Sequence, residues 1–134
     1  MTKMKLVIAG GRDFTDYNML CRALSTYGGP EDLEIVSGGA SGADTLGEKY
    51  AKEHGIDLKI FPAEWAKYGR AAGPIRNREM AEYCDQALIF WDGKSGGTAN
   101  MIEQMKQLGK HNSYRVFMYN DKPKFHPIPG LSRK

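Results

Sequence analysis

Three apolar runs of this chain lead into glycine-rich turns, and this recurrence limits the possible folds more than any other feature of the sequence. The runs are KLVIAGG (5–11), LEIVSGG (33–39) and QALIFWD (86–92), and the turns read GGRDF, SGGASGAD and DGKSGGT. Short continuous apolar runs are typical of strands buried on both faces of a sheet. Helical patterns separate the runs, so the sequence predicts a three-layer α/β fold with a mostly parallel sheet.

The other elements continue this alternation. Two further strands are predicted at 57–63 and 114–120, which gives a sheet of about five strands. Residues 64–75 show no clear period and contain two glycines and a proline, so we predict a long loop there. Right-handed crossovers place every strand-to-helix turn at one edge of such a sheet, so the three glycine turns are expected to meet. Helices are predicted from Thr15 or Asp16 to Tyr27, from Ala43 to His54, at 76–84 and at 96–110.

Length, charge and cysteines narrow the class of protein. We predict one domain at residues 1–119 and an irregular basic, proline-containing tail at 120–134. The tail accounts for the whole net charge of +3, so the predicted domain is neutral overall, which argues against a general nucleic-acid surface. No apolar stretch reaches the roughly 18 residues of a membrane span. Cys21 and Cys84 lie outside any CxxC pattern, so we expect a cytoplasmic protein with reduced cysteines and no membrane partner.

The glycine turns are expected to bind an anion. Glycine lets backbone N–H groups approach a ligand closely, and a helix that follows adds unpaired N–H groups and its positive dipole end. Such loops suit phosphate. The alternative is a tight turn without chemistry, in which Ser41 or Asp44 only caps the next helix. The predicted ligand-binding residues of the turns are Gly10, Gly11, Arg12, Ser37, Gly38, Gly39, Ala40, Ser41, Gly42, Asp44, Ser95, Gly96, Gly97 and Thr98.

These turns differ from the best-known nucleotide loops. No GKS or GKT follows a glycine run at Walker spacing, and GGRDF does not continue as GxGxxG. ATP hydrolysis and NAD-dependent hydride transfer therefore lose support, and no cofactor is required.

The stretch GPIRNREM (73–80) adds candidate ligand residues. We predict that Pro74 begins a helix whose first turn holds two arginines, which oppose the helix dipole unless an anion answers them. Arg76 is predicted to contact phosphate in a bidentate way, with Asn77 beside it. Arg78 either joins this site or pairs with Glu82 on the surface.

Two aromatic residues precede this stretch. Trp65 and Tyr68 are predicted to stack on a base, with a hydrophobic plug as the alternative.

No metal site and no catalytic residue is assigned. His54, His111 and His126 have neither metal-ligand nor triad spacing. Four carboxylates near the predicted strand ends stay open between contacts to ribose hydroxyls, an unrecognised reaction, and simple capping or solvation: Asp13, Asp44, Glu64 and Asp92.

The order of these segments is similar to that of a known superfamily. GGRDF, SGGASGAD, PAEWAKYGRAAGPIRNREM and SGGT, within residues 4–118, resemble the SLOG superfamily (Smf/DprA and LOG) and its small YspA/YpsA-related proteins. The resemblance implies a Rossmann-like fold that binds nucleotides or nucleotide-derived ligands. We therefore expect a binding protein with a sensor or sequestration role.

Two relatives within the superfamily suggest other functions. LOG enzymes hydrolyse the N-glycosidic bond of nucleoside monophosphates, and Arg76 matches their arginine, whereas Asn100 and Met101 stand where their motif has carboxylates. Whether this chain is an enzyme is therefore left open. The likeness to DprA implies single-stranded DNA binding, with Trp65 and Tyr68 stacking bases. A homodimer is compatible with this fold class, and no sequence feature establishes it.

Overall fold

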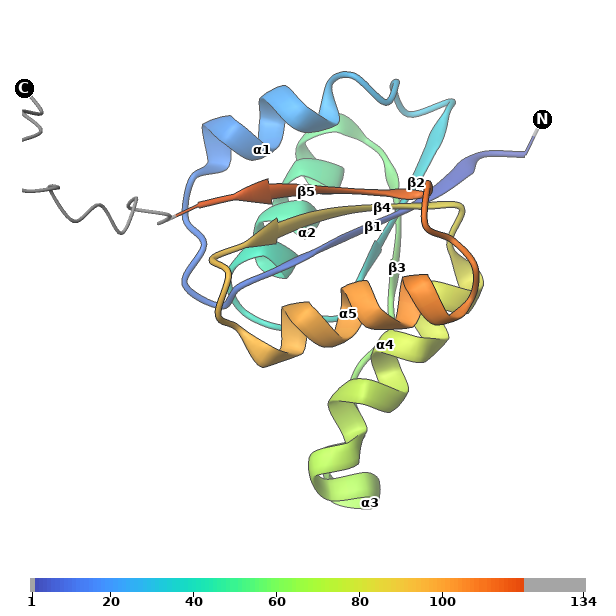
Figure 1. The fold of residues 1–134 in the computed structure, drawn as a ribbon. Coiled ribbons are helices and arrows are strands. Elements are labelled where there is room, and N and C mark those ends of the chain that lie inside the picture. The colour runs from blue at the N-terminus through green and yellow to red at the C-terminus, as the bar shows by residue number, and fades with distance from the viewer. Residues whose placement is uncertain (1, 120–134) are drawn as a thin grey trace, which may run out of the picture.

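A five-stranded parallel sheet forms the centre of the molecule (Figure 1). The computed structural model describes residues 2–119, so the predicted tail at 120–134 lies outside the described residues. The strand order is β3-β2-β1-β4-β5, and every neighbouring pair runs parallel. The predicted Rossmann-like α/β fold is confirmed. The strands are β1 (Met4–Gly10), β2 (Leu33–Ser37), β3 (Asp57–Ile60), β4 (Gln86–Trp91) and β5 (Tyr114–Met118).

Helices cover both faces of the sheet. Side chains of α1 (Tyr17–Leu24) and α2 (Ala43–His54) pack on one face, and those of α4 (Ala72–Tyr83) and α5 (Gly96–Gln107) pack on the other. The chain builds β1, β2 and β3 outward in one direction and then returns to the far side of β1 for β4 and β5. The reversal lies between β1 and β4, where open α/β sheets bind ligands beyond the carboxyl ends of their strands.

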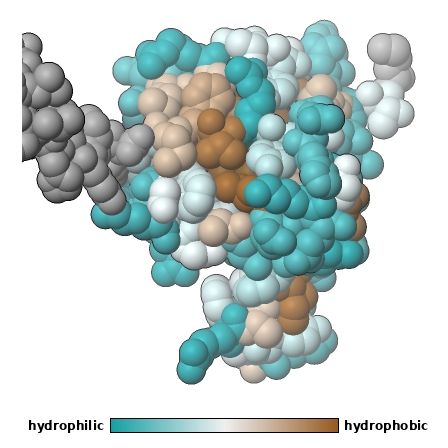
Figure 2. All heavy atoms as spheres, in the orientation of Figure 1, coloured by the Kyte–Doolittle hydropathy of each residue, from teal (hydrophilic) through white to brown (hydrophobic). Residues whose placement is uncertain are grey.

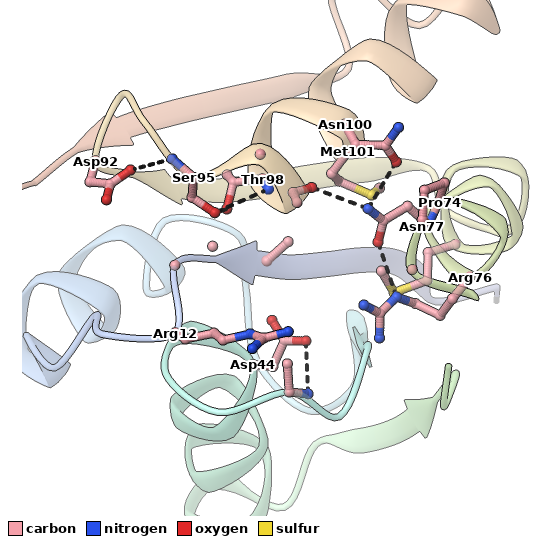
Figure 3. Close-up of a pocket in the computed structure, with 18 of the residues that line it drawn as sticks. Arg12, Asp44, Pro74, Arg76, Asn77, Asp92, Ser95, Thr98, Asn100 and Met101 are labelled. Carbon is pink, nitrogen blue, oxygen red and sulfur yellow. Dashed lines mark hydrogen bonds between the residues drawn. The ribbon is translucent and has the colours of Figure 1, made fainter. Parts of the chain in front are cut away.

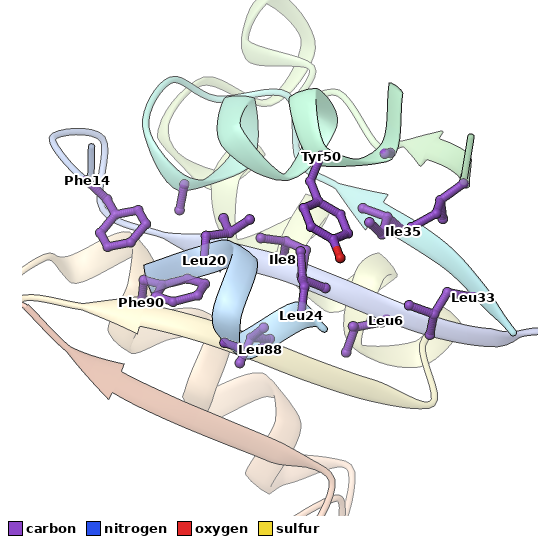
Figure 4. Packing of buried hydrophobic residues seen from close by; sticks show 14 of the residues in the cluster. Leu6, Ile8, Phe14, Leu20, Leu24, Leu33, Ile35, Tyr50, Leu88 and Phe90 are labelled. Atoms are coloured by element: carbon purple, nitrogen blue, oxygen red, sulfur yellow. The ribbon is translucent and has the colours of Figure 1, made fainter. Parts of the chain in front are cut away.

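Burial on both faces explains the unbroken apolar runs. Leu6 and Ile8 of β1 pack against α1 and α2, whereas Val7 and Ala9 point to the side of α4 and α5. All four side chains are at most 6% exposed. Figure 4 shows the buried side chains between the sheet and the helices α1 and α2, with Phe14 stacked on Phe90.

The edge strand β5 is less well covered. Its residues are half-buried or exposed, and Met118 is 43% exposed. On the face of the molecule seen in Figure 2, hydrophobic side chains gather near the middle, with hydrophilic surface around them. The homodimer stays a prediction.

Capping signals give the bounds of α2 and the start of α1. The helix α2 spans the predicted residues, and Gly55 follows it in the left-handed conformation with φ 65°. Asp16 caps α1, because its Oδ1 accepts a hydrogen bond from the Met19 N–H at 3.0 Å. The helix α1 ends at Leu24 rather than Tyr27, and α5 ends before the predicted 110. The predicted strands extend too far at their C-terminal ends, because they include turn residues.

The predicted loop at 64–75 is wrong. This segment forms α3 (Trp65–Tyr68), a 3-10 turn (Gly69–Ala71) and the start of α4, and it extends away from the sheet in Figure 1. A glycine in this segment does not indicate a loop, because Gly69 joins the two short helices at φ 57°.

The start of α4 changes the setting of its arginines. Pro74 is the third residue of α4, where a missing N–H costs no intrahelical bond. Arg76 therefore lies in the second turn and not in the predicted first turn, so it opposes the helix dipole less.

Two further features bear on the sequence predictions: membrane-spanning helices and the cysteines. Within residues 2–119 no helix is long and apolar enough to cross a membrane. Cys21 and Cys84 are free thiols, and Cys84 is buried.

Candidate functional site

A cavity of about 590 Å³ lies beyond the carboxyl ends of β1 and β4 (Figure 3). All three glycine turns contribute to its wall, together with α3 and the N-terminal parts of α4 and α5. Its lining includes twelve of the predicted ligand residues: Gly10, Gly11, Arg12, Ala40, Asp44, Trp65, Arg76, Asn77, Ser95, Gly96, Gly97 and Thr98.

The glycines of the first turn are required by packing. A Cβ at Gly10 would overlap the carbonyl oxygen of Phe90, and a Cβ at Gly11 would overlap the hydroxyl of Tyr119. The Gly11 N–H donates to the same Phe90 carbonyl at 3.1 Å, so it is not available to a ligand. The first turn therefore contributes mainly the side chain of Arg12 to the cavity.

The second turn already uses several of its own amides. The Gly39 N–H donates to Ser37 Oγ at 3.0 Å, and the Ala40 N–H donates to Asp44 Oδ2 at 3.2 Å. Ser37 is fully buried and donates to Glu48 Oε2 at 2.7 Å. Two of the backbone N–H groups expected to form an open cradle in this turn are therefore already bonded to side chains of the turn itself.

The capping alternative also fails for this turn. The N-cap residue of α2 is Gly42, at φ 79°, and no side chain bonds to the helix end there. Asp44 instead reaches back from the first turn of α2 to hold the loop, and Ser41 lies on a neighbouring cavity.

Asp44 is the buried charged group of the site. It is 5% exposed. Burial raises the pKa of its carboxyl to about 6, although the Ala40 N–H and the Arg76 guanidinium both act to lower it. Near neutral pH the carboxyl is therefore mostly ionised, with a protonated fraction that an ordinary aspartate lacks.

Two arginines face this carboxyl. Arg76 is half-buried, and its guanidinium donates to the Gly38 carbonyl and, through Nε, to Asn77 Oδ1 at 3.0 Å. The Arg12 side chain is exposed and forms no hydrogen bond or ion pair with any of residues 2–119. In Figure 3 both guanidinium groups point toward the space beside Asp44. Two cations and one carboxylate give this end of the cavity a net positive charge.

Asn77 ties two helices together. Its amide nitrogen donates to the Gly97 carbonyl at 3.2 Å and to Asn100 Oδ1 at 3.1 Å, and its oxygen accepts from Arg76. These bonds use both ends of the amide, so Asn77 positions Arg76 and joins α4 to α5. Arg78 pairs with Glu82 at 3.1 Å on the surface, as one of its two predicted roles requires.

The third turn remains open to a ligand. Asp92 Oδ1 accepts from the N–H groups of Ser95 and Lys94, each at 2.8 Å, and these bonds lower the pKa of Asp92. Ser95 caps α5 by accepting from Thr98. As the first residues of α5, Gly96 and Gly97 have no intrahelical acceptors for their N–H groups. This turn matches the expected backbone site best.

The remaining predicted residues lie around a second cavity or outside both. This cavity, of about 490 Å³, is lined by Gly38, Gly39 and Ser41 among others. Four residues line both cavities: Arg12, Ala40, Trp65 and Arg76. Trp65 is 53% exposed. Three predicted ligand residues line neither cavity: Ser37, Gly42 and Tyr68.

The four carboxylates whose roles the sequence left undecided differ in their position relative to the cavities. Asp13, Asp44 and Asp92 line the first cavity, and Glu64 lines neither. Asp13 Oδ1 accepts from the hydroxyl of Tyr119 at 2.6 Å. The sequence analysis missed Tyr119, although the end of a fifth parallel strand belongs at this edge. No cluster of metal-ligating side chains occurs among the described residues.

Two comparisons with known proteins place the chain. Residues 4–68 match a family model described as the YspA, cpYpsA-related SLOG family. The gene 61 protein of Mycobacterium phage D29 is 30% identical over an alignment 127 residues long, and the match covers 89% of this chain and 98% of that protein. The chain belongs to the YspA- and cpYpsA-related SLOG family. No solved structure matches it.

Membership of the SLOG family indicates nucleotide-related binding or processing. The matched residues include the first two glycine turns and Trp65, whereas Arg76 and the third turn lie beyond them. The fold nevertheless brings Arg76 and the third turn to the same cavity of this SLOG protein.

Proposed function

We propose that this SLOG protein binds a nucleotide or nucleotide-derived ligand in the cavity between β1 and β4, and that it senses or sequesters this ligand. The phosphate lies between Arg12 and Arg76, and the N–H groups at the start of α5 add further donors. The observation that carries the proposal is the pair of guanidinium groups on one cavity, of which Arg12 has no partner among residues 2–119.

The chemistry of the lining supports this assignment. Arginine donors suit phosphate oxygens, and a half-buried guanidinium binds an anion more strongly than an exposed one. Met80 and Met101 form buried apolar wall, and Trp65 offers an aromatic face, so a base has apolar surface to contact.

Calorimetry with AMP, ADP-ribose, NAD and cyclic nucleotides tests the proposal. We expect at least one of them to bind, and we expect Arg12→Ala to weaken that binding about tenfold or more through the loss of charged hydrogen bonds. Arg22→Ala on α1 is the matched control, since it removes an exposed arginine far from the cavity lining. Absence of binding by every probe at high micromolar concentration would contradict the proposal.

A second candidate function is hydrolysis of a nucleotide N-glycosidic bond. The observation that favours it is Asp44, a buried carboxyl on the cavity whose pKa is raised to about 6 and which could therefore exchange a proton near neutral pH. Against it, Asn100 and Met101 line the cavity where LOG enzymes carry carboxylates.

Chromatography separates the two functions. The binding function leaves AMP intact after long incubation. Release of free base that disappears in Asp44→Asn or Asp92→Asn would establish the enzyme instead, and Glu64→Gln serves as the control because Glu64 lines neither cavity.

A further inference from the structure

The second cavity lies next to the proposed phosphate position. It opens beyond the ends of β2 and β3, and it shares Arg12 and Arg76 with the first cavity. These two arginines are the charged residues that line both cavities. A charged group held between them would lie at the junction of two separate spaces.

Each cavity is large enough for one small molecule. Their volumes of about 590 and 490 Å³ both fall in the range of roughly 300–1,000 Å³ that small-ligand sites occupy. A mononucleotide in the first cavity would therefore leave the second one free.

The lining of the second cavity combines apolar residues with one carboxylate. Ile60, Pro62 and the Trp65 indole supply apolar surface, and Ile60 is 45% exposed. Glu48 lines the same cavity, and the bond from Ser37 to its Oε2 holds the carboxylate in place. A carboxylate accepts several hydrogen bonds, so Glu48 retains capacity for ligand hydroxyls.

This chemistry suits a sugar and disfavours phosphate. Carboxylates accept hydrogen bonds from ribose hydroxyls in dinucleotide-binding folds. A phosphate chain that continued past the arginines would instead meet the negative charge of Glu48 and the apolar surface of Ile60, which both disfavour it.

We propose that the ligand has two halves joined through a phosphate bridge. The bridge lies between Arg12 and Arg76, one nucleoside half fills the first cavity, and a second ribose-bearing half fills the second cavity beside Glu48 and Ile60. This assignment rests on the proposed function and names its ligand class.

Titration calorimetry with three probes tests the assignment: AMP, ATP and di(adenosine-5′) diphosphate, whose two halves are identical. We expect the dinucleotide to bind about tenfold more tightly than AMP or beyond, because the second half buries further apolar surface. We expect ATP to gain less than the dinucleotide, because its extra phosphates approach Glu48.

Ile60→Ser and Met118→Ser form a matched pair. Both residues end edge strands and are similarly exposed, at 45% and 43%, so neither change should alter the fold, which thermal unfolding checks. Ile60→Ser is expected to weaken the dinucleotide about tenfold and to leave AMP unchanged, because it removes apolar contact from the second half alone. Met118→Ser is expected to change neither affinity.

Three outcomes would overturn the assignment. They are equal affinity for AMP and the dinucleotide, an equal loss of both in Ile60→Ser, and a gain for ATP as large as that for the dinucleotide. Binding of AMP in each of these cases leaves the proposed function intact. Absence of binding by all three probes, together with ADP-ribose and NAD, would contradict the proposed function itself.

Discussion

The Asp44 carboxyl links the site to the stability of the protein. Its pKa is about 6 in the folded protein against an ordinary value of 3.8, and burial is the main cause. The folded state therefore binds more protons than the unfolded state between these two values. The stability that this group contributes is present below pH 4 and is lost as the pH rises through 6.

Replacing Asp44 by asparagine should remove this pH dependence. Relative to the wild type, Asp44→Asn is expected to gain about 2–3 kcal/mol in the free energy of unfolding between about pH 4 and about pH 7.5. Urea unfolding of both proteins at the two pH values measures the difference. A wild-type-to-variant difference that does not change with pH would show that Asp44 titrates normally.

Asn77 is expected to act on stability and on ligand binding together. Asn77→Ala leaves Arg76 without one acceptor and breaks the contact of α4 with α5, so we expect a loss of about 1–3 kcal/mol in unfolding free energy. Binding of AMP should weaken as well. Asn18→Ala on the exposed face of α1 is the control for chemical denaturation. Loss of affinity without loss of stability would instead indicate a direct ligand contact.

At the scale of elements, the junction of the first two turns depends on one glycine. Gly42 adopts φ 79°, and a Cβ there would overlap the carbonyl of Gly11. Gly55 at the other end of α2 has φ 65° and open space around its Cβ position. Both positions carry backbone strain when substituted, and only Gly42 also carries a steric clash.

This pair gives a prediction about the loops. Gly55→Ala is expected to cost about 1–2 kcal/mol of unfolding free energy through backbone conformation alone. Gly42→Ala should cost at least about 2 kcal/mol more, because backbone atoms must move. Urea unfolding compares the two variants. Equal losses of unfolding free energy in the two variants would mean that the first and second glycine turns can move apart without loss of stability.

The same elements show what the sequence could predict. The bounds of α2 were correct because a glycine turn precedes it, Gly55 follows it and apolar residues recur at helical spacing. Residues 64–75 were predicted wrongly because their glycines and proline resemble loop signals, although Gly69 only joins short helices and Pro74 falls where its missing N–H is tolerated.

The candidate site was predictable in position and less so in detail. Parallel topology alone brings the turns to one edge. The occupancy of the Gly39 and Ala40 amides by Ser37 and Asp44 depends on side-chain geometry, which no local pattern reveals. For the same reason, the roles of Asn77 and Tyr119 emerge only from the packed structure.

At the scale of the whole molecule, charge separates a small ligand from a nucleic acid. Residues 1–119 are neutral overall, so the positive charge of Arg12 and Arg76 is local to one end of the cavity. We expect AMP affinity to fall only a few-fold between about 50 and 200 mM salt, whereas a protein that contacts many phosphates loses about a thousandfold or more. Titration of AMP and of a single-stranded oligonucleotide at both salt concentrations measures this. Tight oligonucleotide binding with a steep salt slope would favour the DprA-like function.

A crystal structure of the protein with bound AMP tests the central claim most directly. The account predicts that the phosphate lies within hydrogen-bonding distance of both Arg12 and Arg76, beside the N-terminus of α5, with the nucleoside in the cavity between β1 and β4. A nucleotide bound elsewhere, or one whose phosphate contacts neither arginine, would contradict it.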